Sequence, residues 1–443
     1  MLVLRVGCLI DGRGGRPVIN GIVAIEDKTI AYAGPAAGYV PPPAAETWDL
    51  PRYTLLPGLI DAHVHVLGSG ELDDTDWFMR EATELPASIA FGCLLNAQRN
   101  LQAGFTAIRD LSCRQYADVA LRDAINAGRL EGPRMKVCGL GLTSTAGHMD
   151  RTTHFTVGVA LPGPAAVVDG PDDARRAVRM NLRFGVDFIK INATLSELVR
   201  PRGGLYSPEM TLETMRAICE VAHAHGRKVA AHCHGGIGVT WALDAGVDVL
   251  EHGRFLSDEQ IERMARSGTF LCPTLSPEAR GAELGLRPKD PHVAAWQARA
   301  RAAMYETVGR AQAAGVAIVN GSDAAMPGVV HGGGAYEMAQ LVRAGLTPMD
   351  AIVAATRTAA RCLDAADEIG SVEAGKSADL VLVDGDPLED IGILQDLSRV
   401  PLVLKDGRVV ADRRPRQEQA PGHAVPRRST APRESGKSEA RHV

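Results

Sequence analysis

The sequence of 443 residues predicts an α/β protein, a (β/α)8 TIM barrel with a small β-sandwich domain built from both chain ends. Eight apolar or β-branched runs recur along the middle of the chain. Amphipathic stretches rich in Ala, Arg and Glu separate most of these runs. The two ends of the chain instead consist of short strand-like runs and turns. A content of 45% hydrophobic and 23% charged residues is that of an ordinary globular protein.

The first 56 residues are predicted to form short strands. LVLRVGCLI (2–10) is strand-like, and the DGRGG that follows is typical of a turn. INGIVAIEDKTIAYAG (19–34) repeats the pattern as strand, turn and strand, with Asp27 and Lys28 at the bend. No helical period is present here.

From about residue 57 the pattern alternates between strands and helices. The eight expected barrel strands are 55–65, 105–111, 134–142, 186–191, 228–234, 247–253, 269–275 and 316–323. Between them, stretches such as 172–185 and 211–226 show a helical period and end at Gly, as helices often do.

After residue 324, two further helical stretches are expected at 335–345 and 349–363. The chain then returns to strand and turn patterns. The expected domains are a composite β-sandwich (1–57 plus 368–412), a TIM barrel (58–367) and a basic tail (413–443). The tail is rich in Pro and Arg and has few large apolar residues, so it is expected to be disordered.

Charge and cysteine content limit the possible partners and location. A formal net charge of −5 gives no reason to expect binding to nucleic acid or to an anionic membrane surface. The eight cysteines form no CxxC pair, and most lie in apolar segments, which favours reduced thiols. No run is long enough to span a membrane, and the N-terminal apolar run is too short for a signal peptide. We therefore expect a cytoplasmic protein.

The ends of five predicted strands carry polar residues that can bind a metal ion. His63 and His65 share one face of a strand by alternation, and the other candidates are Lys190, His232, His234, Glu251, His252 and Asp323. Each has an ordinary structural explanation when taken alone, such as a core histidine, a paired lysine or a helix N-cap. Five coincidences at the same end of one barrel are improbable, and we therefore expect a metal site there.

The residue types suit hydrolytic chemistry. Neutral imidazoles and carboxylates suit Zn²⁺ or a similar divalent ion. A desolvated Lys190 loses its proton more readily and can add CO₂, giving a carbamate that can bridge two cations. A water bridging two ions becomes a hydroxide nucleophile, and Asp323 can take its proton and pass it to the leaving group. We expect Asp323, His252 and Lys190 to be the catalytic residues.

These motifs resemble the amidohydrolase superfamily. The residues that carry the resemblance are PGLIDAHVH (57–65), DFIK (187–190), AAHCHG (230–235), EHG (251–253) and GSD (321–323), in the family's order. The similarity extends over about residues 1–410. STAGHMD (144–150) and the segments 167–190 and 331–352 resemble the branch with imidazolonepropionase-related hydrolases, Xaa-Pro and Xaa-Arg dipeptidases and ochratoxinase.

The resemblance implies two divalent ions, with Zn²⁺ as the expected metal. It implies that His63, His65 and Asp323 bind one ion, that His232 and His252 bind the second, and that N-carboxylated Lys190 bridges them. His148 matches a histidine that faces the substrate carbonyl in relatives, whereas His234 stands where several relatives have tyrosine. Relatives often form homo-oligomers, so the same is expected here.

The expected substrate is a small molecule, a dipeptide or an N-acyl amino acid. Such a substrate has a free carboxylate, which requires a cationic clamp, and Arg254 follows ligand His252 by two residues. Arg151 and Arg202 lie on other loops at the same mouth, and Tyr206 and the Gly-rich loop 331–334 are further candidates to line the pocket.

The expected reaction is cleavage of an amide (peptide) bond by attack of a metal-bridging hydroxide. Alternatives on the same scaffold are a cyclic amidase, a lactonase or a deaminase, although Lys190 argues against most deaminases and against true imidazolonepropionases. A non-catalytic scaffold protein would be expected to have lost ligands, and this sequence retains the full set.

Overall fold

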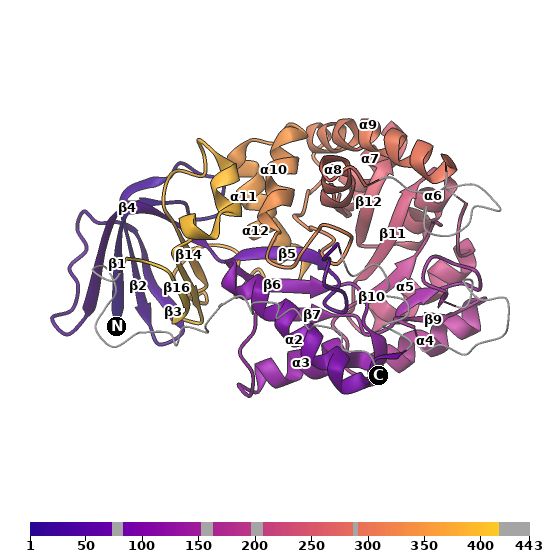
Figure 1. Cartoon of the computed structure of the whole chain (residues 1–443), viewed down its shortest axis with the longest axis horizontal. Helices are drawn as coiled ribbons and strands as arrows, with labels where there is room; N and C mark the ends of the chain where they lie inside the picture. The colour runs from indigo at the N-terminus through magenta and orange to yellow at the C-terminus, as the bar shows by residue number, and fades with distance from the viewer. Residues whose placement is uncertain (73–82, 152–162, 196–206, 287–290, 416–443) are drawn as a thin grey trace, which may run out of the picture.

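The computed structural model describes residues 1–72, 83–151, 163–195, 207–286 and 291–415. It consists of a β domain made from both ends of the chain and a barrel of strands and helices beside it (Figure 1). This is the fold class that the sequence predicts.

The β domain is one seven-stranded sheet in the order β16-β15-β14-β4-β1-β2-β3. Its strands are β1 (Leu2–Leu9), β2 (Val18–Glu26), β3 (Thr29–Pro35), β4 (Glu46–Pro57), β14 (Leu380–Val383), β15 (Leu402–Lys405) and β16 (Arg408–Asp412). The bend after β2 bonds to residues just before β14, because Ala378 N donates to Lys28 O. The sheet therefore curls over one buried core, to which alternating residues such as Leu380 and Leu382 belong.

The barrel strands run parallel in two sheets, β5-β6-β7 and β13-β12-β11-β10-β8-β9. They are β5 (Leu59–Val64), β6 (Phe105–Asp110), β7 (Arg134–Val137), β8 (Gly141–Thr143), β9 (Ala165–Val167), β10 (Ile189–Asn192), β11 (Val229–Gly235), β12 (Val249–Phe255) and β13 (Phe270–Cys272). The predicted strand 134–142 is split into β7 and β8 around residues 138–140. The predicted run 55–65 is likewise shared between β4, in the β domain, and β5.

The eighth predicted run, 316–323, lies between β13 and β5 and closes the barrel. Val319 N donates to Leu271 O on one side, and Ala62 N donates to Asn320 O on the other. Gly321 permits a close approach to β5, because a Cβ atom there would lie 2.7 Å from the Cβ atom of His63. The run is not a continuous strand, since it forms one isolated bridge, between Ile318 and Leu271, and Ala324 just after it bridges to Val64.

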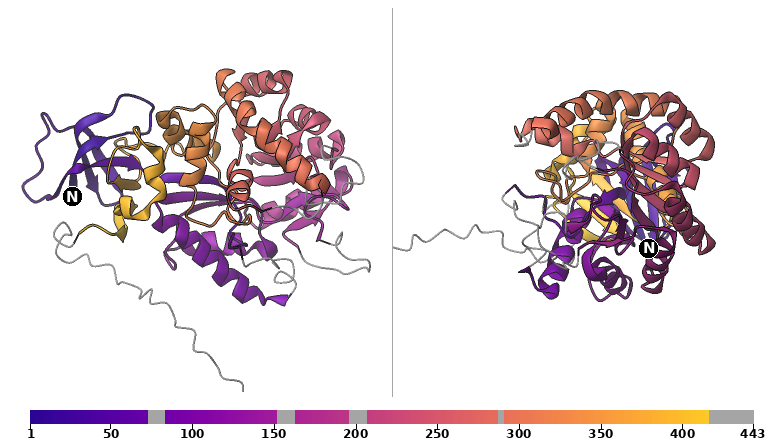
Figure 2. Two further views of the ribbon diagram at one scale, coloured as in Figure 1. Left: turned by 45° about the horizontal axis from the view of Figure 1, so that its top comes forward. Right: turned by 90° about the vertical axis from the view of Figure 1, so that its right-hand side faces the viewer.

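Helices surround the barrel strands, as the end-on view in Figure 2 shows. They are α2 (Pro86–Gln102), α3 (Ala117–Asn126), α4 (Pro171–Arg183), α5 (Leu212–Ala224), α6 (Gly236–Ala245), α7 (Asp258–Ser267), α8 (Ser276–Glu283), α9 (Pro291–Ala313), α10 (Ala335–Arg343), α11 (Pro348–Ala354) and α12 (Arg357–Cys362). The predicted helix 349–363 is two helices, because Thr356 leaves the helical conformation between α11 and α12. α7 begins with a capping box formed by Ser257 and Gln260.

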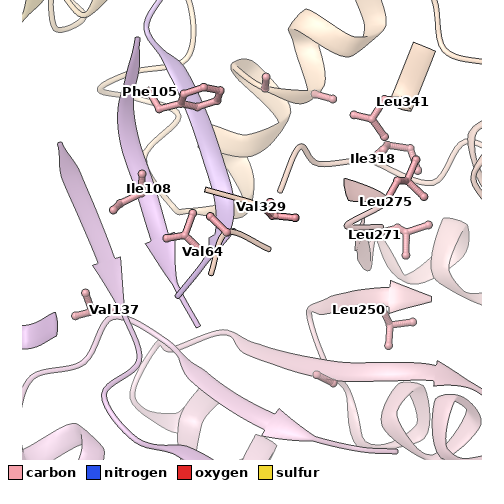
Figure 3. Close-up of a cluster of buried hydrophobic side chains, with 14 of the residues drawn as sticks. Val64, Phe105, Ile108, Val137, Leu250, Leu271, Leu275, Ile318, Val329 and Leu341 are labelled. Atoms are coloured by element: carbon pink, nitrogen blue, oxygen red, sulfur yellow. The ribbon is translucent and has the colours of Figure 1, made fainter. Parts of the chain in front are cut away.

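The apolar faces of the strands and helices meet in one large core, part of which Figure 3 shows around Val64, Phe105 and Leu271. All eight cysteines carry free thiols, and seven of them are buried. Among the described residues, no helix is long and apolar enough to cross a membrane.

The β domain is tied to the bottom of the barrel. Arg134 on β7 forms ion pairs with Asp379 and Asp406 of the β domain. Arg413 and Arg414 lie within the range predicted as tail, yet Arg414 is buried and its guanidinium lies 4.3 Å from the Trp48 ring centroid. Arg413 donates to Gln102 O, so the folded part of the chain extends past residue 412.

Candidate metal centre

One pocket lies at the C-terminal ends of the barrel strands, where α/β barrels place their active sites. It brings together ten side chains that the sequence singled out, namely His63, His65, His148, Arg151, Lys190, His232, His234, His252, Arg254 and Asp323. Arg202 and Tyr206 lie outside the described residues. The Gly-rich loop 331–334 does not line this pocket. Instead His331 is buried, with Nε2 within 3.2 Å of His65 O and 3.0 Å of Gly68 O.

Asp323 stands at the centre of the predicted ligands. Its carboxylate lies 3.4 Å from Nε2 of His63, 3.4 Å from Nε2 of His65 and 4.0 Å from Nδ1 of His252. Burial alone would raise the pKa of Asp323, but the two neighbouring histidines outweigh it and hold the pKa well below its usual range. The donor atoms of His63, His252 and Asp323 all lie within 4.8 Å of one another, so the two expected ions, one on His63 and Asp323 and the other on His252, would be neighbours.

A group of imidazole rings continues from this point along the mouth. The ring of His232 lies 4.5 Å from that of His252, 4.6 Å from that of His234 and 4.2 Å from that of His148, between ring centroids. His232 Nε2 is buried and has no hydrogen-bond partner among the described residues. A buried, unpaired imidazole nitrogen beside other imidazoles fits a metal ligand.

Lys190 reaches the pocket from β10 and is almost completely buried. Burial lowers the pKa of its ammonium, because no water is available to solvate the charge. A lysine in this environment has more of the free amine that carbamate formation requires.

The backbone turns sharply at two of the predicted ligands. His252 has a φ of 72° and Asp323 a φ of 57°, in the left-handed region that residues other than Gly rarely adopt. Strained conformations of this kind are held in place by the surrounding structure and concentrate at functional sites. Here they turn both side chains into the mouth of the barrel.

Two glutamates support the predicted residues, namely buried Glu251, which the sequence offered as a candidate ligand, and Glu209, which the sequence left without a role. Glu251 accepts a hydrogen bond from Nδ1 of His63 at 2.8 Å, and Arg109 donates to its other oxygen. Glu209 accepts from the backbone N–H of His148, and burial raises the pKa of Glu209 to about 7. The charged pair Arg109 and Asp110 within an otherwise apolar strand, FTAIRDL, was the available signal for Arg109.

Arg254 is in the pocket wall, but its charge is already paired. Its Nη2 donates to Glu278 at 2.5 Å and its Nη1 to Nδ1 of His234 at 3.1 Å. Since a guanidinium only donates, His234 accepts at Nδ1 and carries its proton on Nε2 when neutral. Arg254 is therefore one part of a three-residue group (Arg254, His234 and Glu278), and the sequence did not indicate Glu278.

The remaining wall of the pocket is largely apolar. It is formed by Leu67, Met149, Pro164, Pro277, Met326 and Pro327. His148 lies among these residues and His232, and burial, followed by the charge of Arg151, lowers its pKa to about 3. His148 is therefore a neutral imidazole at neutral pH.

The chain is similar to known proteins in sequence and in fold. The model of the amidohydrolase family matches residues 54–410. Ochratoxinase from Aspergillus niger is 33% identical over 429 residues, which covers 92% of this chain and 86% of ochratoxinase. Its crystal structure matches with a TM-score of 0.81 at 29% identity over 93% of this chain and 95% of that one.

Two solved peptidase structures are also similar. A Xaa-Pro dipeptidase with methionine bound in the active site is 31% identical, with a TM-score of 0.81, over 93% of this chain and 99% of that chain. A prolidase in complex with N-methylphosphonate-L-proline is 28% identical, with a TM-score of 0.79, over the same shares of the two chains.

Proposed function

Because this chain belongs to the amidohydrolase family, a hydrolase family acting on carbon–nitrogen bonds, we propose that it cleaves the amide bond of a dipeptide or an N-acyl amino acid. The observation that carries the proposal is the convergence of imidazoles, Lys190 and Asp323 in one buried mouth. The named similar proteins include peptidases, which supports an amide substrate with a free carboxylate.

The proposed site holds two divalent cations, with Zn²⁺ as the expected ion. His63, His65 and Asp323 would hold one, and His232 and His252 the other, with N-carboxylated Lys190 between them. The unpaired nitrogen of His232 and the lowered pKa of Lys190 support this assignment. When bound, such cations polarise a substrate carbonyl and acidify an attacking water.

The proposed roles of the protein groups follow from their protonation states. Asp323, as an ionised carboxylate, would orient the attacking water and take up its proton. It would return that proton to the leaving nitrogen when the carbon–nitrogen bond breaks. Neutral His148 would donate a hydrogen bond to the carbonyl oxygen of the substrate.

The proposed substrate carries an apolar side chain beside its carboxylate. Leu67, Met149 and Met326 offer an apolar surface that such a side chain would cover. We propose that the carboxylate is recognised by hydrogen-bond donors of Arg254 and His234, with Glu278 holding Arg254 in place through their ion pair.

A substrate screen tests this proposal. The Zn²⁺-loaded protein is incubated with a mixed library of dipeptides, N-acyl amino acids, lactones and cyclic ureides, and the products are identified by mass spectrometry. Cleavage confined to amides of carboxylate substrates, with a preference for apolar side chains, is the expected result. Turnover of lactones or cyclic compounds alone would contradict the proposed substrate but not the proposed metal site.

A further inference from the structure

A buried chain of polar contacts crosses the barrel directly beneath the pocket. Nδ1 of His63 lies 2.8 Å from Glu251, Glu251 lies 2.6 Å from Nη2 of Arg109, and Arg109 Nε donates to Ala62 O at 2.7 Å. The residues come from three barrel strands, β5, β6 and β12, and none is more than 2% exposed. Because these hydrogen bonds are buried and connected to one another, they hold each of the side chains in one orientation.

The contacts decide which nitrogen of His63 carries the proton. Glu251 is completely buried with one oxygen 2.6 Å from Nη2 of Arg109, and a buried guanidinium at this distance pairs with a charged carboxylate. Glu251 is therefore an ionised carboxylate, which can only accept hydrogen bonds. The proton of neutral His63 must then be on Nδ1, and the lone pair on Nε2, the nitrogen that faces Asp323.

We propose that Glu251 and Arg109 are positioning residues that hold His63 with its Nε2 lone pair directed into the metal site. This inference rests on the proposed function, because it assumes that His63 is a metal ligand. A ligating histidine that donates its other N–H to a carboxylate has a fixed ring and a more basic ligand nitrogen.

Arg109 is as necessary to this role as Glu251. It keeps the buried carboxylate ionised, and its second contact, with the carbonyl of Ala62, ties the pair to the residue before His63. The guanidinium also lies 5.3 Å from the Phe188 ring centroid, which limits its movement on the far side. A lysine lacks the planar guanidinium group, so its ammonium cannot contact Glu251 and the Ala62 carbonyl in the same rigid geometry.

A competing interpretation makes Glu251 a metal ligand itself. Donor atoms of His63, Glu251 and Cys272 do lie within 4.8 Å of one another. Both oxygens of Glu251 already have partners, however, because one lies 2.6 Å from Nη2 of Arg109 and the other 2.8 Å from Nδ1 of His63. The contacts therefore assign Glu251 to His63.

The test measures metal affinity and does not depend on activity. The full chain is stripped of metal, and Zn²⁺ binding is measured by competition with a chromogenic chelator. In Glu251→Gln the amide N–H₂ faces either Arg109 or Nδ1 of His63, so we expect affinity to fall by about 10- to 100-fold. Glu337→Gln is the matched control and is expected to keep wild-type affinity, because the described hydrogen bonds of this buried glutamate are to Leu275 and Ser276 and not to a proposed ligand. Equal affinity in wild type and Glu251→Gln overturns the proposal.

Two further measurements apply if Glu251→Gln does not fold. Arg109→Lys is expected to lower Zn²⁺ affinity in the same direction, and unchanged affinity in this variant contradicts the role of Arg109. In addition, ¹⁵N NMR of histidine-labelled, metal-free protein reports the tautomer of His63. The expected signal is protonation at Nδ1, and protonation at Nε2 overturns the proposal. If the wild-type protein binds no divalent ion, the proposed function is refuted. The tautomer of His63 would still show whether Glu251 accepts a hydrogen bond from its Nδ1.

Discussion

Individual residues at the mouth are held by partners that define their protonation. Asp323 is ionised because His63 and His65 flank it, His148 is neutral because it is buried near Arg151, and Lys190 has a lowered pKa because it is buried. Each proposed role therefore depends on a protonation state that neighbouring residues determine, and single substitutions can test it.

Replacement of Lys190 tests the carbamate. Lys190→Ala removes the proposed bridge, so we expect loss of at least one metal ion per chain. Activity should fall by more than about 100-fold, because even outer-shell partners of metal ligands contribute 10- to 100-fold. Metal content is measured by elemental analysis and activity with the best substrate of the screen. Partial recovery with a short carboxylic acid would support the bridge, and full activity of Lys190→Ala without added acid would refute it.

Replacement of Arg254 tests recognition of the carboxylate. Arg254→Met is expected to raise KM for carboxylate substrates roughly tenfold or more, since a hydrogen bond to a charged group contributes about 1.5–3 kcal/mol. It also leaves Glu278 buried without its counter-ion, at a cost in stability of about 3–5 kcal/mol.

A double variant separates these two effects of Arg254. Arg254→Met combined with Glu278→Met removes the unpaired charge, so stability in urea should recover while KM stays raised. If KM for carboxylate substrates is unchanged in either variant, Arg254 takes no part in recognition.

At the scale of the elements, a buried side chain on α10 holds the start of α8, the helix that follows β13 at the mouth of the barrel. Glu337 on α10 accepts hydrogen bonds from the backbone N–H groups of Leu275 and Ser276, at the start of α8. These are N–H groups that the helix itself cannot pair. α8 also supplies Glu278, so this contact fixes the counter-ion of Arg254.

The buried carboxyl of Glu337 predicts a pH dependence of stability. Burial raises its pKa to about 8 in the folded protein. Between about pH 4.5 and pH 8 the native state holds this proton and the unfolded state does not, so its contribution to stability falls as pH rises, by at most about 1.4 kcal/mol per pH unit. Urea unfolding of wild type and Glu337→Gln at pH 5, 6.5 and 8 checks this. The variant should show a smaller fall, and identical slopes would contradict the assignment.

At the scale of the whole molecule, the β domain and the barrel share a polar junction. Arg134 at the bottom of the barrel pairs with Asp379 and Asp406, and Gly58 N donates to Asp379 O. The junction lies at the end of the barrel opposite the pocket, since β7 begins at Arg134 and parallel strands end at the mouth.

Arg134→Met is expected to lower the free energy of unfolding by about 1–3 kcal/mol, because it leaves the buried carboxylate of Asp379 with fewer donors. Urea denaturation measures the loss, and kcat with the best substrate should stay near the wild-type value because the site is remote. A change below about 0.5 kcal/mol would mean that the ion pairs at this junction contribute as little as exposed ones do.

The fold class and the residue types at the strand ends follow from the amino-acid sequence alone. Both are local signals: apolar runs of strand length alternate with helical periods, and residues such as His63, Lys190 and Asp323 interrupt apolar runs where polar groups are costly. The order of these motifs along the chain is also sufficient to indicate the family.

The partners of these residues, in contrast, depend on the tertiary structure. Glu251 and Arg109 are 142 residues apart in sequence and meet because barrel closure places β6 and β12 across one interior. The pairing of Arg254 with Glu278 depends on where α8 begins, and the split of strand 134–142 depends on a local departure from the sheet at residues 138–140. Contacts of this kind follow from strand register and closure, which no pattern within one strand specifies.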